Sequence, residues 1–215
     1  MRDDWDQRAI ENARYYVQNE KRDWSDEEFF ASGELRVREE ILSDMTNICQ
    51  GKPPEQMRVL EIGCGAGRVT RALAALFGEV HAVDVSGEMV RLARQAVRPF
   101  SNVFVYQNNG VDLSIIPVDQ IDFAFSDLVF QHIPNREIVE NYLREIHRLL
   151  RPGALFKFQV QGDLAVQAKP DDTWVGVPFS DEQIVSIAQR CGFERRYSYG
   201  AGTTFFWNWF FKPAA

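Results

Sequence analysis

The sequence predicts an α/β fold: a doubly wound, mostly parallel sheet flanked by helices. From residue 57 onward, apolar strand-like runs alternate with helical patterns, an order typical of parallel sheets wound on both sides. A glycine-rich turn, GCGAG at 63–67, joins the first strand to the first helix of this region. The last expected strand, TTFFWNWFF at 203–211, has aromatic residues at both odd and even positions. We therefore expect both faces of this strand to be covered.

Residues 1–56 are expected to be helical, because apolar residues recur at helical spacing within 10–17 and within 35–45. GKPPEQ at 51–56 ends this region, since paired prolines and a glycine interrupt both helices and sheet ladders. We therefore divide the chain into an N-terminal helical lid, 1–56, and a ligand-binding domain, 57–215. The alternative is that the aromatic residues of 1–56 pack permanently on the core.

The elements of the larger domain follow from their local patterns. We expect strands at 57–62, 79–85, 102–107, 121–126 and 154–160, with two more closing the chain. Helices are expected at 66–77, 86–97, 135–150 and 180–191. Ser86 is placed to cap the second helix, and Ser180 with Gln183 forms a capping box that opens the last, which Gly192 ends.

Composition narrows the class of ligand and the compartment. The chain has 24 Lys and Arg against 31 Asp and Glu, a net charge of −7 that opposes nucleic-acid binding and favours a small-molecule partner. Its three cysteines form no CxxC pair, so we expect reduced thiols and no zinc site. With a charged N-terminus and no stretch of about 20 apolar residues, we expect an untargeted cytoplasmic protein without a membrane partner.

The glycine turn points to a ribose-containing ligand. Gly63, Gly65 and Gly67 follow a strand and precede a helix, where a doubly wound fold brings ligand against backbone. The dinucleotide fingerprint requires a further glycine, and Arg68 stands in that place, which disfavours a pyrophosphate. Asp84 ends the second strand and suits the two hydroxyls of a ribose.

These segments resemble the class I S-adenosylmethionine-dependent methyltransferases. The resemblance is carried by VLEIGCGAGRVT, VHAVDVS, IDFAFSDLVFQHIP and LLRPGALFKF, in that order, and covers residues 57–211. It implies a seven-stranded sheet with a reversed last strand and S-adenosylmethionine as cofactor. Where related sequences usually have LLRPGG this chain has LLRPGA, and an amide pair stands where Gly-Asp is frequent.

The same resemblance assigns cofactor contacts. The methionine moiety would lie against the first-strand acid and the glycine loop, the ribose on Asp84, and the adenine near the second and third strands. The implied cofactor-binding residues are Glu61, Gly63, Cys64, Gly65, Gly67, Asp84, Val85, Met89, Asn108, Asn109, Gly110 and Ser126.

Methyl transfer from a sulfonium is an in-line displacement, so few catalytic side chains are required. A base helps where a hydroxyl or an ammonium must lose its proton, and His132, after the fourth strand, is the candidate. The alternative is that His132 only hydrogen-bonds to the backbone. Together with Tyr15 and Tyr16 of the lid, His132 is expected to line the acceptor pocket.

We therefore expect a methyltransferase for a small-molecule acceptor, with oxygen or nitrogen favoured over carbon as the accepting atom. The sequence SDLV at 126–129 lacks the Asn/Asp-Pro-Pro-Tyr/Phe signature, which disfavours nucleobases and glutamine amides. No oxygen-ligand cluster is readable, so we expect no metal. A monomer or homodimer is expected. The alternatives are an NAD(P)-dependent oxidoreductase and a catalytically inactive S-adenosylmethionine-binding partner subunit.

Overall fold

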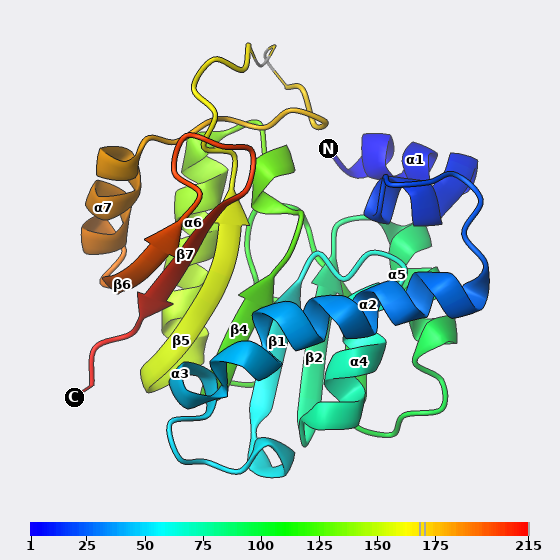
Figure 1. The fold of residues 1–215 in the computed structure, drawn as a ribbon, viewed down its shortest axis with the longest axis horizontal. Coiled ribbons are helices and arrows are strands. Elements are labelled where there is room, and N and C mark those ends of the chain that lie inside the picture. The colour runs from blue at the N-terminus through cyan, green and yellow to red at the C-terminus, as the bar shows by residue number, and fades with distance from the viewer. Residues whose placement is uncertain (168, 170, 215) are drawn as a thin grey trace. The chain divides into compact units, whose positions relative to one another are not determined.

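A computed structural model of the protein describes residues 1–167, 169 and 171–214. Among these residues, seven strands form a sheet in the order β3-β2-β1-β4-β5-β7-β6 (Figure 1). β7 runs antiparallel to β5 and β6, so the predicted doubly wound sheet with a reversed last strand is confirmed. The strands are β1 (Arg58–Ile62), β2 (Glu79–Asp84), β3 (Val103–Gln107), β4 (Ile121–Ser126), β5 (Leu150–Val160), β6 (Glu194–Tyr199) and β7 (Phe206–Phe211).

After residue 57, the helices of the described residues lie where the sequence patterns predict them. The α-helices are α1 (Arg2–Val17), α2 (Asp26–Glu40), α3 (Met45–Cys49), α4 (Arg68–Leu76), α5 (Gly87–Ala96), α6 (Arg136–Leu149) and α7 (Asp181–Arg190), and the short 3-10 turns are η1 (Leu42–Asp44), η2 (Pro54–Gln56) and η3 (Phe130–His132). The chain divides into two compact units, Arg2–Asn109 and Gly110–Ala215 with Met1, and each is described by itself. None of the helices in the described part of the chain is long and apolar enough to cross a membrane.

The first unit holds the predicted N-terminal helices and three parallel strands. β1 pairs with β2 so that Ile62 lies opposite Val83, and β2 pairs with β3 so that Asp84 lies opposite Gln107. α2 packs on α4 (Figure 1), and Gly33 permits this contact because a Cβ there would lie 2.1 Å from the Arg68 carbonyl oxygen. The helices that precede residue 51 thus share a compact unit with β1, β2 and β3.

Two details of the N-terminal helices differ from the simple periodic pattern. α1 is kinked at Asn12, whose side-chain Oδ1 accepts from the Tyr15 N–H (3.2 Å) and so caps the second half of the helix. α2 ends at Glu40, and the following turn breaks the helical spacing. After this break Ile41 is buried and Leu42 is exposed. Leu35, within α2, is exposed as well.

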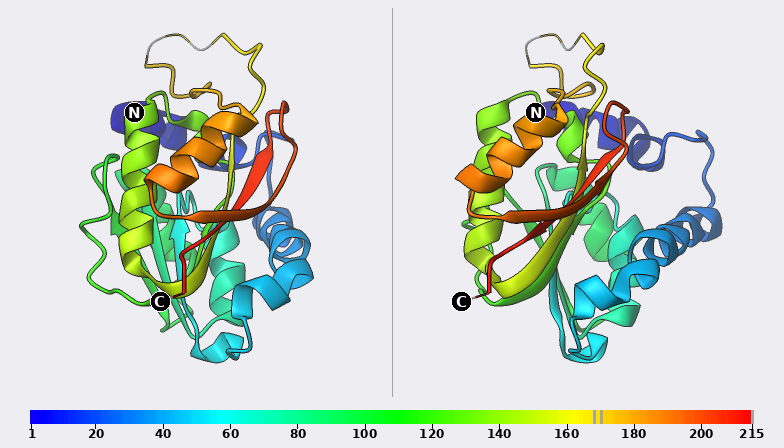
Figure 2. Two further views of the ribbon diagram at one scale, coloured as in Figure 1. Left: turned by 90° about the vertical axis from the view of Figure 1, so that its left-hand side faces the viewer. Right: turned by 60° about the vertical axis from the view of Figure 1, so that its left-hand side comes forward.

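The second unit is built on aromatic packing. Figure 2 shows β6 and β7 as a hairpin with α7 beside β6. All six residues of β7 are buried, as predicted for a strand covered on both faces. On one face Phe210 meets Phe158 (ring centroids 4.9 Å apart), and on the other Trp207 stacks on Phe125 (6.0 Å). These aromatic side chains therefore form part of the hydrophobic core of this unit.

Both sequence-predicted caps are present. The Ser86 hydroxyl accepts from the Met89 N–H (3.1 Å) at the start of α5. Ser180 and Gln183 form the reciprocal capping box of α7. Gly192 adopts φ +81° directly after the last helical turn, the left-handed conformation in which glycine ends helices at least cost.

Candidate cofactor-binding site

The glycine loop between β1 and α4 requires glycine at alternate positions. Gly63, Gly65 and Gly67 have φ values of +75°, +51° and +85°, and Gly67 is the left-handed N-cap of α4. The Gly63 and Cys64 N–H groups both donate to the Val83 carbonyl oxygen (2.8 and 2.9 Å), which ties the loop to the end of β2. L-residues rarely adopt such backbone angles, so the loop conformation follows directly from the G-x-G-x-G pattern.

Asp84 is bonded to this loop. Its Oδ2 accepts from the Gly65 N–H (2.8 Å) and its Oδ1 accepts from the Ser86 N–H (2.9 Å), which fixes the plane of the carboxylate. Burial raises the pKa of Asp84 to about 6, against the lowering effect of these backbone donors. Each carboxylate oxygen has a second lone pair, so the group retains capacity to accept from a ligand's hydroxyls.

Helix α1 contacts the same loop and the start of α5. Asp6 Oδ1 accepts from the Ser86 hydroxyl (2.6 Å) and from the Glu88 N–H (3.1 Å). A Cβ on Gly65 would lie only 2.6 Å from Val17 Cγ2. The N-terminal helix therefore lies directly against two of the elements that the sequence assigns to the cofactor.

Asn108 completes this group at the end of β3. Its side chain is buried, its N–H donates to the Asp84 carbonyl oxygen (3.0 Å), and its own carbonyl oxygen accepts from Arg2 Nη2 (3.0 Å). The glycine loop, Asp84 and Asn108 thus lie on adjacent β1, β2 and β3 ends, as the sequence predicts for a single site.

The remaining predicted cofactor residues of this unit differ in what they present. The Cys64 thiol packs with Val90 and Val105, and burial raises its pKa well above the usual value, so Cys64 offers a ligand only its backbone. Met89 is buried in a cluster with Phe29 of α2, Glu61 is a buried carboxylate on β1, Val85 is half-buried and Asn109 is exposed.

Gly110, Ser126 and His132 belong to the second unit. Gly110 is buried with φ +79°, and Ser126 is buried as the last residue of β4. His132 is half-buried in η3, and its Nδ1 donates to the Trp174 carbonyl oxygen (2.6 Å). The backbone hydrogen bond considered for His132 is therefore present, and it engages Nδ1 but not Nε2 of the ring.

Tyr15 and Tyr16 occupy the half of α1 that follows the kink. Their rings meet edge to face (5.2 Å), the Arg22 guanidinium lies over Tyr15 (4.8 Å), and the Tyr16 hydroxyl donates to Glu11 Oε2 (2.9 Å). The hydrogen bond to the Glu11 carboxylate raises the pKa of Tyr16. Both rings are half-buried, and an acceptor role for them stays a prediction.

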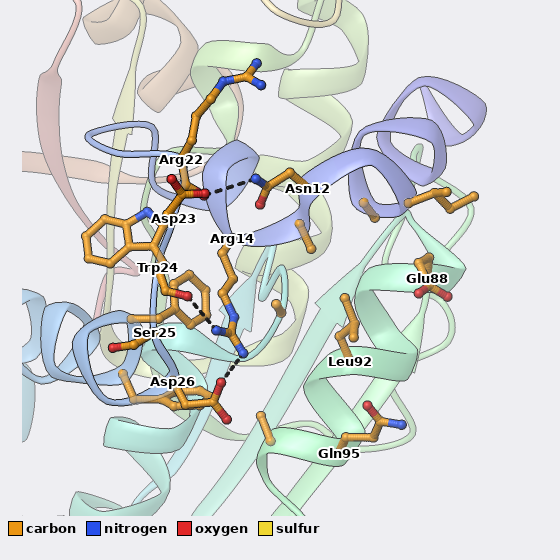
Figure 3. Close-up of a pocket in the computed structure, with 17 residues that line it drawn as sticks. Asn12, Arg14, Arg22, Asp23, Trp24, Ser25, Asp26, Glu88, Leu92 and Gln95 are labelled. Carbon is orange, nitrogen blue, oxygen red and sulfur yellow. Dashed lines mark hydrogen bonds and ion pairs between the residues drawn. The ribbon is translucent and has the colours of Figure 1, made fainter.

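A cavity of about 840 Å³ lies beside the loop in the first unit (Figure 3). It is bounded by α1, the turn before α2 and helix α5, and Figure 3 shows Arg14 reaching toward Trp24 and Asp26. The Arg14 guanidinium donates to the Trp24 carbonyl oxygen (2.8 Å) and pairs with Asp26. Of the glycine loop only Ala66 lines this cavity, so it is distinct from the cofactor crevice that the sequence predicts.

Comparison with known proteins agrees with this geometry. Residues 59–153 match the family model described as "Methyltransferase domain". The matched segment is somewhat less than half of the chain, and over it the chain is similar to methyltransferase domains. The match spans the glycine loop, Asp84 and the segment from β4 to the start of β5.

Curated proteins and solved structures with similar domains carry methyltransferase names. The chain is 25% identical over 185 residues to the putative methyltransferase YqeM of Bacillus subtilis, covering 82% of this chain and 73% of that protein. It is 31% identical over 97 residues to the ubiquinone biosynthesis O-methyltransferase of Xanthomonas oryzae pv. oryzae, covering 45% of this chain but 39% of that protein. The magnesium protoporphyrin IX methyltransferase of Synechocystis PCC 6803 with bound SAH shares the fold, with a TM-score of 0.69, 14% identity and coverage of 98% and 97% of the two chains.

Three residues that contact the candidate cofactor site were not predicted from the sequence to do so: Arg2, Asp6 and Val17. Their only signal was position on a helical N-terminal segment, because a single charged or branched residue on a helix has no distinctive spacing. Among the residues that the structure describes, no group of three His, Cys, Asp or Glu side chains is placed to hold a metal ion.

Proposed function

We propose that the protein transfers a methyl group from S-adenosylmethionine to a small-molecule acceptor, with oxygen or nitrogen as the accepting atom. The observation that carries this proposal is the bond between the glycine loop and the ribose acid, in which Asp84 Oδ2 accepts from the Gly65 N–H (2.8 Å). It puts the glycine loop and a carboxylate of fixed orientation side by side. The names of the relatives support the reaction, and the Synechocystis enzyme holds SAH.

The residues present fit such a cofactor. The Asp84 carboxylate keeps capacity to accept from ribose hydroxyls, and Gly65 and Gly67 let the loop pack closely on α1 and α5, because a Cβ there would meet Val17 or Ala93. The loop would hold the methionine end, Asp84 the ribose hydroxyls, and Val85 with Asn108 the adenine. The cofactor supplies an electrophilic methyl group on a sulfonium, and the chain's part is to orient it and exclude water.

Helix α1 is proposed as a lid over this cofactor. It is held by the Asp6 bonds to Ser86 and Glu88, the Arg2 bond to Asn108, and the Val17 contact with Gly65. α1 also packs Ala9 and Val17 in an apolar cluster with Phe29 and Met89, so opening of the lid must release both these contacts and the hydrogen bonds. When closed, the lid would exclude water from the cofactor, and local opening of α1 would let the cofactor enter and leave.

On the acceptor side we propose His132 as the general base. A carbonyl oxygen only accepts, so Nδ1 must carry the proton that bonds to Trp174, and neutral His132 then presents an unprotonated Nε2. Its single lone pair can take a proton from a hydroxyl or an ammonium when the Gln131 amide, whose Nε2 lies 3.4 Å away, turns aside. Tyr15 and Tyr16 stay proposed acceptor-pocket residues.

The setting proposed for this enzyme is the cytoplasm, as a monomer or homodimer without a nucleic-acid partner. The net charge of −7 disfavours polyanions, and the three cysteines are buried free thiols, as suits a reducing compartment.

Calorimetry with S-adenosylhomocysteine and NAD, run side by side, tests the central claim. We expect S-adenosylhomocysteine to bind and NAD to fail, because Arg68 stands where a dinucleotide loop needs glycine, and its buried side chain bonds to the Ser32 carbonyl oxygen (3.2 Å). A methyl-release assay over hydroxyl and amine acceptors then identifies the substrate class. Micromolar NAD binding with no affinity for S-adenosylhomocysteine would overturn the proposal, and cofactor binding without turnover of any acceptor would favour an inactive partner subunit.

A further inference from the structure

Two buried glutamines stand beside His132. Gln131 precedes it in η3 and is 8% exposed, and Gln159 near the end of β5 is 1% exposed. Gln159 Nε2 donates to Gln131 Oε1 (2.9 Å). Burying a primary amide is costly unless it is hydrogen-bonded, so a paired amide in an otherwise aromatic core needs a reason.

The direction of each hydrogen bond follows from the backbone. The Trp174 carbonyl oxygen accepts from His132 Nδ1 (2.6 Å), so Nε2 of the neutral ring is an acceptor. Gln131 Oε1 accepts from Gln159, which turns the Gln131 Nε2 toward His132 Nε2 (3.4 Å). The sequence of donors is then Gln159 to Gln131, Gln131 to His132, and His132 to Trp174.

The protonated ring needs the opposite arrangement. With a proton on Nε2 as well, both ring nitrogens donate, and Gln131 must present its oxygen. A half-turn of the amide exchanges oxygen and NH₂ with almost no change of shape, and Gln159 can make the matching turn. Leucine would satisfy neither state of the ring, and glutamate would favour only the charged one.

We propose that Gln131, supported by Gln159, is a positioning residue that serves both protonation states of His132 during methyl transfer. The inference rests on the proposed base role of His132. As the acceptor atom bonds to the methyl carbon and the sulfonium leaves as a thioether, the acceptor's proton passes to Nε2, and from there to water. Because Nε2 has a single lone pair, the Gln131 NH₂ group that bonds to it turns away as the proton arrives, and the Gln131 oxygen then accepts from the new N–H.

The backbone around His132 is fixed well enough for this role. The Gly176 N–H donates to the Gln131 carbonyl oxygen (2.8 Å), and the Val177 N–H to that of Ile133 (3.0 Å). A Cβ on Gly176 would lie 2.6 Å from the Gln131 carbonyl oxygen, so this close approach depends on glycine.

Two charged groups on these segments bond to the backbone. Asp172 accepts from the Trp174 and Val175 N–H groups, and Arg136 donates to the Pro178 carbonyl oxygen and covers the Phe179 ring. Asp127 lies in the turn between β4 and η3. The charges of Asp127, Arg136 and Asp172, with those of Asp163, Lys169 and Asp171 on the loop that carries Trp174, would contribute to a titration of His132 in addition to the hydrogen bonds of the glutamine pair.

The test is a nitrogen NMR titration of the imidazoles, which needs no acceptor molecule. The chain has three histidines, and the His132→Asn variant assigns the signal. We expect neutral His132 as the Nδ1–H tautomer in the native protein. Gln131→Glu should raise the His132 pKa by about one unit or more, because a carboxylate stabilises the imidazolium, and Gln131→Leu should lower it.

Turnover gives the second readout, with the most active acceptor of the panel. We expect the acidic limb of the kcat profile to move with the His132 pKa in Gln131→Glu, and kcat to fall about tenfold in Gln131→Leu with the cofactor Kd within about twofold. Gln159→Leu leaves Gln131 in place but removes its orienting donor, so a smaller change in the same direction is expected, and this variant serves if Gln131→Glu does not fold.

Gln161→Leu is the matched control. Gln161 is also a buried amide in this region, but its Oε1 accepts from the Asp163 N–H (3.0 Å), so His132 should titrate normally in this variant. An unchanged pKa and tautomer in the Gln131 and Gln159 variants would overturn the positioning role. A shifted pKa with an unshifted kcat profile would instead remove His132 as the base, which separates failure of the proposed function from failure of the hydrogen-bond assignment.

Discussion

Cofactor binding should weaken steeply below pH 6, because desolvation raises the pKa of the ribose acid, Asp84, to about 6. The pKa of Asp84 is raised from 3.8 to about 6 by burial, and the nearby Asp6 carboxylate acts in the same direction. Only the ionised form can accept from two ribose hydroxyls while it also accepts from the Gly65 and Ser86 N–H groups. Protonation of Asp84 therefore competes with binding.

The size of the effect follows from the pKa. If the protonated form does not bind, the apparent Kd scales with one plus the ratio of protonated to ionised Asp84. That factor is about 1.1 at pH 7 and about 11 at pH 5 for a pKa of about 6, so the Kd should rise about tenfold over this interval. A carboxyl with the ordinary pKa of 3.8 would change the Kd by less than about 10% between pH 7 and pH 5. The loss appears as pH falls, which is the sign for a carboxylate that must be ionised to bind.

Calorimetry with S-adenosylhomocysteine from pH 5 to pH 7.5 measures this dependence. The Asp84→Asn variant is the control: it should bind more weakly at pH 7 by about 1.5–3 kcal/mol, the scale of hydrogen bonds to a charged group, and its Kd should be nearly flat with pH. A native Kd that does not change between pH 7 and pH 5, or an equal tenfold loss in Asp84→Asn, would refute the assignment of the ribose to Asp84.

Three other outcomes are expected. Gly65→Ala should destabilise the protein by about 1–3 kcal/mol, because its φ of +51° disfavours a side chain and the new Cβ meets Val17; Val17→Ala in the same chain should restore part of the melting temperature, and no restoration would show that the clash is not the cause. Gly33→Ala should separate α2 from α4, with a similar loss in urea unfolding, and native stability would contradict the contact with the Arg68 carbonyl oxygen. Amide exchange in α1 should slow when S-adenosylhomocysteine binds and should quicken in Asp6→Asn; equal protection in all three states would make α1 permanent core and not a lid.

Much of the fold was predictable because its signals are local. The β1 glycine loop, the Ser86 cap and the Ser180 capping box depend on backbone angles and hydrogen bonds within a few residues, and each is present. Helix α2 was less accurately predicted. Its apolar residues kept helical spacing past Glu40, but the helix ends there, and Leu42 is exposed.

The cofactor side of the candidate site could be predicted from the sequence in more detail than the acceptor side. Asp84 and the glycine loop were identified from their order along the chain, and the structure joins them by a hydrogen bond. The Cys64 thiol points into the core, a direction that a loop pattern does not specify. His132 was identified by position, but its bond to Trp174 spans 42 residues and has no signature in either segment.

The sequence by itself determined the alternation of strands and helices, the turn that needs three glycines and the acid that follows the next strand. Hydrophobic periodicity, helix capping and turn chemistry all act over distances of a few residues. Only the tertiary structure established that Val17 packs α1 on that turn, that Asp6 bonds α1 to the start of α5, and that Gln131, bonded to Gln159, lies against His132. It also set the pKa of Asp84 at about 6, since desolvation depends on what surrounds a carboxyl in space and not on its neighbours in the chain.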